Sequence, residues 1–119
     1  MASPMYDRNN VFAKILRGEL PCKRVYEDDL VLAFHDINPE APVHVLVIPK
    51  GEFVSFDDFV SSDYDVAEFF RVVGRIAREL GLDVCGYRIV TNHGRSAGQI
   101  VYHFHVHILG YPPNPSVEK

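Results

Sequence analysis

The chain has 119 residues, of which 47% are hydrophobic and 24% are charged, the ordinary balance of a single globular domain. Sixteen acidic residues against twelve basic ones give a net charge of −4, which argues against a general nucleic-acid or anionic-membrane partner. The start of the chain lacks the layout of a signal peptide, and no apolar run approaches the roughly 18 residues of a membrane span, so we expect a cytoplasmic protein.

The first predicted elements are a flexible N-terminus over residues 1–8 and a short helix within residues 9–20. Asn9 or Asn10 is a suitable N-cap, and Pro21 prevents the helix from continuing. The helix would place four apolar side chains on one face: Val11, Phe12, Ile15 and Leu16.

Three strands are predicted between residues 23 and 49. Two of them flank a tight turn at Asp28 and Asp29, and the second of these covers Val31 to His35. The breaker "NPEAP" separates it from "VHVLVIP" at 43–49, a β-branched run typical of a buried strand.

A long amphipathic helix is predicted within residues 61–82, where apolar side chains recur at helical spacing. Ser62 and Asp65 resemble a capping box at its start, and Gly81 is a suitable C′ residue at its end. Two further strands are predicted at 86–92 and 101–109, joined by the small polar loop "HGRSAGQ".

Together these elements predict an α+β fold. We expect a mainly antiparallel five-stranded sheet with one long and one short helix, and we expect the helices to cover one side of it. The folded domain would span residues 9–111. Residues 112–119 would form a C-terminal tail, because its prolines cannot donate to a sheet ladder.

The stretch "YHFHVHILG" raises the question of function, because histidine occupies every second position of a predicted strand. Alternate side chains of a strand share a face. Phe104, Val106 and Ile108 would therefore supply the core, and the opposite face would carry three imidazoles: His103, His105 and His107.

A shared metal ion is one interpretation of this face. His103 and His107 would have backbones about 13 Å apart, too far to share one ion. Zinc ligand atoms lie within roughly 3.5 Å of one another, so a site would need one His-x-His pair and an outside ligand such as His44. A plain polar face turned to water is a second interpretation.

Nucleophilic catalysis is the third interpretation and the one we favour. A neutral imidazole is a good nucleophile toward phosphorus when one ring nitrogen is held as N–H and the other presents its lone pair. The loop before the histidines suits a phosphate, because Gly94 and Gly98 allow close backbone approach and Asn92, Ser96 and Gln99 offer polar groups.

These residues resemble the histidine-triad (HIT) family, whose signature alternates histidine with apolar residues as "HFHVHIL" does. The resemblance also covers "AFHDINPEAPVHVLVIPK" and "GYRIVTNHGRSAGQIVYHFHVHILG", and is closest to the Hint-like branch of nucleotide-binding phosphoramidases. It implies a HIT-like fold joined across a homodimer.

The resemblance also implies roles for individual residues. His105 would be the nucleophile toward the α-phosphorus, with His103 and His107 binding phosphate or orienting it and His44 behind them. The phosphate site would comprise Asn92, Gly98, Gln99 and Val101. Asp36 would accept hydrogen bonds from both ribose hydroxyls, although it could equally be a turn residue that bonds its own backbone. A purine pocket would comprise Val11, Phe12, Ile15, Phe34, His35, Ile37 and Leu46, residues that would otherwise be read as ordinary core.

The implied activity is cleavage of a purine nucleoside 5′-phosphoramidate through a nucleotidyl-histidine, without an obligatory cofactor or metal. The partner would be a purine nucleoside monophosphate or its conjugates. A dinucleoside polyphosphate hydrolase of the Fhit type and a nucleotide-binding adaptor with vestigial catalysis are the alternatives. One position departs from the family: some relatives carry Ser or Thr two residues after Gly98, where this chain has Ile100.

Overall fold

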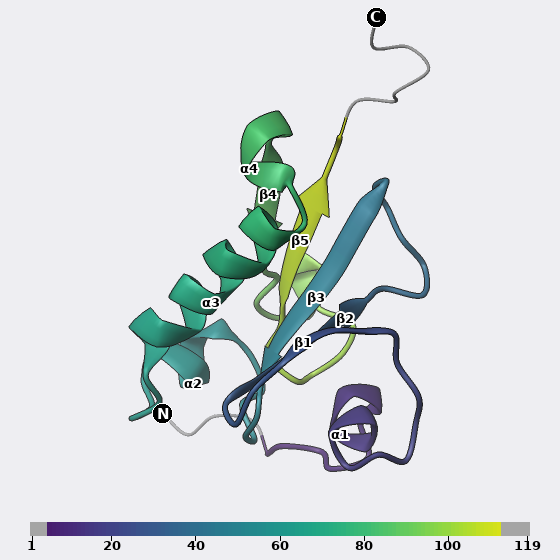
Figure 1. Cartoon of the computed structure of the whole chain (residues 1–119). Helices are drawn as coiled ribbons and strands as arrows, with labels where there is room; N and C mark the ends of the chain where they lie inside the picture. The colour runs from purple at the N-terminus through teal and green to yellow at the C-terminus, as the bar shows by residue number, and fades with distance from the viewer. Residues whose placement is uncertain (1–4, 113–119) are drawn as a thin grey trace, which may run out of the picture.

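The computed structural model describes residues 5–112 of the chain. Its centre is one five-stranded antiparallel sheet, which confirms the predicted α+β fold (Figure 1). The strands follow the order β1-β2-β3-β5-β4 across the sheet. Their bounds are β1 Arg24–Glu27, β2 Val31–His35, β3 Val43–Pro49, β4 Tyr87–Val90 and β5 Val106–Gly110.

The predicted short and long helices are α1 (Val11–Leu16) and α3 (Val66–Glu79). The structure adds α2 (Phe56–Val60), α4 (Leu82–Cys85) and a 3-10 turn over Arg95–Ala97. The expectation of only one long and one short helix is therefore corrected. The added helices have five and four residues, too few to establish a helical period in the sequence.

Helices lie on both faces of the sheet, which corrects the expectation that they cover one side (Figure 1). On one face, α3 packs Phe69, Val72 and Ile76 against the valines of β2 and β3. On the other face, Phe12 of α1 packs against a smaller set from the same two strands: Leu32, Phe34, Leu46 and Ile48. Strand alternation explains the division, because successive residues of β2 and β3 point to opposite faces.

The helix ends follow local capping rules, with one correction. Asn10 is the N-cap of α1, and its side chain accepts a hydrogen bond from the Ala13 N–H. The N-cap of α3 is Asp65 and not the predicted Ser62, since the Asp65 carboxylate accepts from the N–H of Glu68. At the other end Gly81 adopts a φ of 78°, the left-handed conformation expected of a C′ glycine.

Strand β5 begins later than predicted, so His103 and His105 precede it. The register places Val106 opposite Val47, and its continuation would place Pro49 opposite Phe104. Proline has no N–H to donate, so the ladder between β3 and β5 cannot continue there.

The two sides of the segment 103–108 nevertheless remain distinct. Phe104, Val106 and Ile108 all pack in the core beside α3, as predicted. The N–H of Phe104 donates to the carbonyl of Phe53 at 2.7 Å, which takes the place of a ladder hydrogen bond. The histidine side therefore faces α1 although its first two members lie outside the strand.

Both ends of the chain extend beyond the described part. Residues 113–119, most of the predicted C-terminal tail, and residues 1–4 of the predicted flexible N-terminus lie outside the described residues. Among residues 5–112, none of the helices has the length and apolar character required to cross a membrane.

Candidate active site

Four histidines line the face of the sheet that carries α1. His107 on β5 lies opposite Leu46 on β3, so the two side chains share a face, and His44 lies on that face two residues before Leu46. The His105 and His107 ring centroids are 5.1 Å apart, and those of His44 and His107 are 5.2 Å apart. His105, His107 and His44 therefore form a continuous row of imidazoles, and none of the three triad histidines is a solvent-exposed side chain.

Hydrogen bonding at His105 leaves one nitrogen available as a nucleophile. Its Nδ1 lies 2.7 Å from the main-chain carbonyl oxygen of His103, and a carbonyl can only accept. The proton of neutral His105 is therefore on Nδ1, and Nε2 carries the lone pair. The Thr91 hydroxyl donates to the carbonyl of His105 at 2.8 Å and holds the backbone at this point.

His103 is fully buried and has both ring nitrogens engaged. Nε2 lies 2.9 Å from the carbonyl oxygen of Pro49, so it is the protonated nitrogen. Nδ1 is then an acceptor and lies 2.5 Å from the hydroxyl of Tyr6. In this geometry His103 has no free atom for a phosphate, and its carbonyl orients His105 instead.

His44 and His107 form a directed hydrogen-bonded pair. The N–H of Glu40 donates to Nδ1 of His44 at 3.0 Å, so His44 carries its proton on Nε2. That N–H donates to Nδ1 of His107 at 2.9 Å. In its neutral form His107 therefore presents an Nε2–H, which can donate to a phosphoryl oxygen or a leaving group.

Asp36 makes the turn contact considered for it from the sequence, and it also lies near His44. Oδ1 accepts from the N–H of Asn38 at 2.8 Å, as a turn residue would, and Oδ2 lies 3.4 Å from Nε2 of His44. Asp36, His44 and His107 each offer one potential metal-ligand atom within 4.8 Å of the others. The sequence suggested a His-x-His pair with His44 as the possible ligand set, and the structure brings together a different set.

Burial keeps the triad neutral. Desolvation lowers the pKa of His103 and of His107 to about 4, and it lowers the pKa of His105 as well. The neighbouring imidazoles add to this effect at His103 and His107, because two positive charges at this spacing repel. All three rings are therefore neutral near pH 7, the form in which a nucleophilic imidazole reacts.

The glycine loop holds its shape through Gln99. Its buried side-chain oxygen accepts from the N–H of Gly94 at 2.8 Å, and its amide nitrogen donates to the carbonyls of Val54 and Val101. Asn92 donates to the carbonyl of Ala97 at 2.8 Å. Gln99 is thus engaged with the backbone of the loop, whereas its expected role was contact with phosphate.

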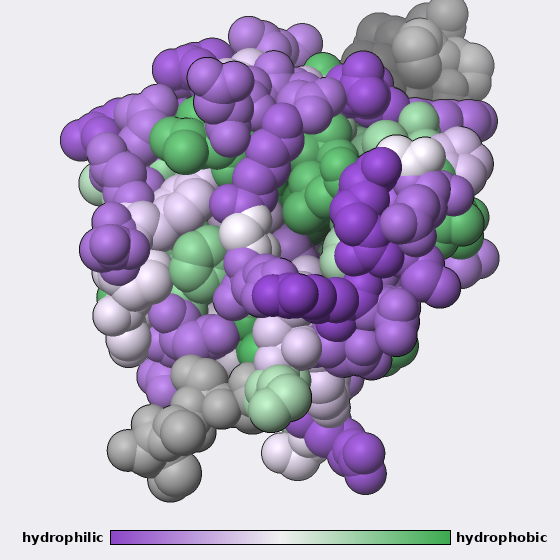
Figure 2. Space-filling view, turned by 90° about the horizontal axis from the view of Figure 1, so that it is seen from below, coloured by the Kyte–Doolittle hydropathy of each residue, from purple (hydrophilic) through white to green (hydrophobic). Residues whose placement is uncertain are grey.

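The expected purine pocket is only partly assembled. Phe12, Ile15, Phe34 and Leu46 pack together on the histidine face with Val101 beside them, and the Phe12 ring meets that of His105 edge to face at 4.9 Å. The other three residues are exposed and lie outside this cluster: Val11, His35 and Ile37. The end of the molecule that carries α1 shows apolar surface between hydrophilic side chains (Figure 2).

Sequence reasoning missed two residues that contact the triad. Tyr6 lies in a segment predicted to be flexible, and its partner His103 is 97 positions away. Thr91 directly follows β4, and its hydroxyl reaches the main-chain carbonyl of His105. Neither position carries a local signal in the sequence, because both contacts depend on the tertiary fold.

Comparison with known proteins identifies the architecture. The family model described as "HIT domain" matches residues 17–113. An uncharacterized HIT-like protein of Azospirillum brasilense is 55% identical over 117 residues, 96% of either chain. A protein of Escherichia coli named purine nucleoside phosphoramidase is 44% identical over 105 residues, 87% of either chain. A solved histidine triad protein from Clostridium difficile is 43% identical, with a TM-score of 0.81 over 93% of this chain and 97% of its own. The chain belongs to the HIT family.

Proposed function

We propose that this protein binds a purine nucleoside 5′-phosphoramidate, or a related nucleotidyl conjugate, and hydrolyses the bond at its α-phosphorus through His105. The observation that carries the proposal is the hydrogen bond from His105 Nδ1 to the carbonyl of His103, which leaves Nε2 unprotonated. The likeness to the Escherichia coli protein named purine nucleoside phosphoramidase supports the substrate class.

The first step forms a nucleotidyl-histidine. Nε2 of His105 attacks the α-phosphorus, a nitrogen–phosphorus bond forms to the imidazole, and the bond to the leaving amine breaks. His107 Nε2–H faces the same reaction zone and donates a hydrogen bond to the leaving nitrogen, and the amine takes the proton that it needs from water. The bond between His44 and His107 holds the His107 proton on the correct nitrogen.

The second step returns the enzyme to its starting state. Water attacks the phosphorus, the phosphorus–imidazole bond breaks, and the pair of electrons returns to Nε2 of His105. The attacking water releases one proton to solvent, and the nucleoside monophosphate leaves. This route uses no metal ion, because the nucleophile and the hydrogen-bond donor to the leaving group are both side chains.

Asp36 and the apolar cluster supply the proposed binding contacts. The Asp36 carboxylate is one-fifth exposed and adjoins the His44–His107 pair, a position suited to ribose hydroxyls. Phe12 and Phe34 stand edge to face at 5.5 Å and form the apolar wall beside His105 against which a purine would pack.

We also propose a homodimer. The position of β4 at the edge of the sheet, with Ile89 and Tyr87 exposed, supports it.

The test is a substrate panel on wild type and His105→Asn. We expect turnover of an adenosine or guanosine 5′-phosphoramidate by wild type, and a loss on the order of 1,000-fold in the variant. Activity within a few-fold of wild type in His105→Asn would contradict the nucleophile assignment. EDTA treatment should leave the wild-type rate unchanged, and loss of activity that zinc restores would favour a metal at Asp36, His44 and His107 instead.

The same panel separates the two alternatives. Faster cleavage of a dinucleoside polyphosphate than of the phosphoramidate would identify the Fhit-type activity. Tight binding of a purine nucleoside monophosphate with negligible turnover of either substrate would identify an adaptor.

A further inference from the structure

The N-terminal segment before α1 reaches across the molecule to the first histidine of the triad. Tyr6 is partly buried, and its hydroxyl lies 2.5 Å from Nδ1 of His103. The two rings also meet edge to face, with centroids 5.6 Å apart. Since Nε2 of His103 is occupied by the carbonyl of Pro49, the hydroxyl of Tyr6 is the donor and Nδ1 the acceptor.

The backbone on either side of Tyr6 is held in place. Asp7 accepts from the N–H of Asn9 through its side chain and from Asn10 through its carbonyl, which forms a tight turn into α1. Arg8 forms an ion pair with Glu52 at 2.8 Å, and Arg17 donates to the carbonyl of Arg8 at 2.7 Å.

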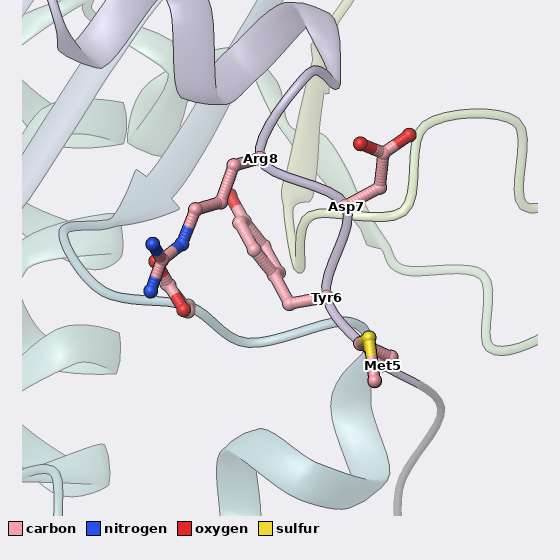
Figure 3. A pocket seen from close by; sticks show the side chains of 5 residues that line it. Met5, Tyr6, Asp7 and Arg8 are labelled. Carbon is pink, nitrogen blue, oxygen red and sulfur yellow. The ribbon is translucent and has the colours of Figure 1, made fainter.

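The turn directs neighbouring side chains to opposite sides of the N-terminal segment. The side chains of Tyr6 and Arg8 extend to one side of the segment and that of Asp7 to the other (Figure 3). The ion pair of Arg8 is largely exposed and contributes little by itself. Tyr6 is therefore the anchor of the segment.

The anchor matters because His103 links Tyr6 to the nucleophile. A neutral imidazole can carry its proton on either nitrogen. A donor at Nδ1 and an acceptor at Nε2 select one form, the Nε2–H tautomer. That tautomer bonds the carbonyl of Pro49 and holds the His103 backbone whose carbonyl receives Nδ1–H of His105.

We propose that Tyr6 is a positioning residue: its hydroxyl fixes the tautomer and orientation of His103, and through the His103 carbonyl it fixes the orientation of His105. The inference rests on the proposed function, because it assigns Tyr6 a part in keeping the nucleophilic nitrogen aimed at the substrate. Burial raises the pKa of the Tyr6 phenol, so the hydroxyl keeps its proton and stays a donor across the neutral range.

The test compares Tyr6→Phe with Tyr102→Phe. Tyr6→Phe removes the hydroxyl and keeps the ring that packs on His103. Tyr102→Phe removes a hydroxyl one residue from His103, and among the described residues that hydroxyl has no hydrogen-bond partner. Nitrogen-15 NMR of the histidine rings reports the tautomer without any need for turnover, and steady-state kinetics on the nucleoside phosphoramidate report the effect on catalysis.

We expect wild-type His103 in the Nε2–H tautomer with Nδ1 as a hydrogen-bonded acceptor. In Tyr6→Phe the Nδ1 signal should move toward that of a free nitrogen, and kcat should fall roughly tenfold with KM within twofold of wild type. The Tyr102→Phe protein should match wild type in both measurements. A purely structural role for Tyr6 would lower thermal stability and leave kcat of the folded protein unchanged.

Three results would overturn the inference. These are an Nδ1–H tautomer of His103 in wild type, ring signals unaffected by Tyr6→Phe, and altered ring signals with an unchanged kcat. A wild type that turns over no substrate would instead contradict the proposed function, and the ring signals would then decide whether Tyr6 holds His103. If Tyr6→Phe fails to fold, the wild-type spectrum alone decides between the two tautomers.

Discussion

The two faces of the sheet are built from the same strands but from different chemistry. The face under α3 is apolar throughout, with Phe59, Phe69 and Phe104 among its fully buried side chains. The face under α1 has a much smaller apolar cluster and carries His44, His103, His105 and His107. Burial of imidazoles without charge costs stability unless each nitrogen finds a partner.

The comparison separates stability from function along one stretch of chain, residues 105–108, which leads into β5. Val106 and Ile108 point into the core while His105 and His107 point to the other side. No buried side-chain polar atom among the described residues lacks a hydrogen-bond partner, so the histidine face is ordered by hydrogen bonds and the other face by packing. Substitutions on the two faces should therefore have effects of different kinds.

The largest expected effect on stability lies on the α3 face. Phe69→Ala should lower the free energy of unfolding by about 3–5 kcal/mol, because it leaves a cavity beside four other aromatic rings. Urea denaturation measures the change, with half-buried Phe70→Ala as the matched control. Activity of the folded fraction should stay within twofold of wild type, and a selective loss of kcat would show that the two faces are not independent.

A substitution at Asp36 should affect binding and leave the core intact. Asp36→Asn keeps an oxygen for the Asn38 N–H and removes the negative charge that would bind the ribose hydroxyls. We expect KM for a ribonucleoside phosphoramidate to rise roughly tenfold and KM for its 2′-deoxy analogue to change much less. Equal changes for both substrates would contradict a ribose contact.

Acid should destabilise the protein through the histidine face. His103 has a pKa of about 4 in the folded state against 6.5 for the free side chain. Between these values the unfolded chain binds a proton that the folded protein excludes, so stability is full above pH 6.5 and falls as pH is lowered toward 4. One such group contributes a slope of at most about 1.4 kcal/mol per pH unit.

The matched measurement is the urea midpoint of wild type and His103→Gln at pH 7 and at pH 5. The carboxylates titrate in both proteins, so the difference between their two decreases in urea midpoint from pH 7 to pH 5 isolates the contribution of His103. The decrease should be smaller in the variant. Equal decreases would show that the His103 pKa is not lowered in the folded state.

The smallest expected effect concerns Ile100, whose side chain is 90% exposed. Ile100→Ser should change the free energy of unfolding by no more than about 0.5 kcal/mol, as for other exposed positions. We expect it to alter the ratio of kcat/KM between two leaving groups by a few-fold, because a hydroxyl at this position can bond the departing group. An unchanged ratio would show that the side chain at position 100 does not act on the leaving group.

The sequence predicted the elements whose signal is local. The β-branched run of β3 and the periodicity of α3 both correspond to observed elements, and alternation placed Phe104, Val106 and Ile108 opposite the histidines. The predicted start of β5 was wrong because the start depends on Pro49 of β3, which would lie opposite Phe104 if the register continued. α2 and α4 were missed because four or five residues carry no measurable period.

The site was predictable in its residue types and not in its connections. The tandem histidines and the glycine loop are visible in the sequence, but the Tyr6–His103 contact and the convergence of Asp36 with His107 arise only in three dimensions. Gln99 shows the same limit, because sequence alone does not distinguish a ligand contact from a hydrogen bond to the loop backbone.

The most direct test of the nucleophile is the mass of the protein during turnover. Intact-protein and peptide mass spectrometry after a rapid alkaline quench, which preserves a phosphorus–imidazole bond, would reveal a covalent nucleotidyl group. We expect wild type to carry one nucleoside monophosphate on the peptide that contains His105, and His105→Asn to carry none. Turnover by wild type without any adduct, or an adduct that persists in the variant, would contradict His105 as the nucleophile.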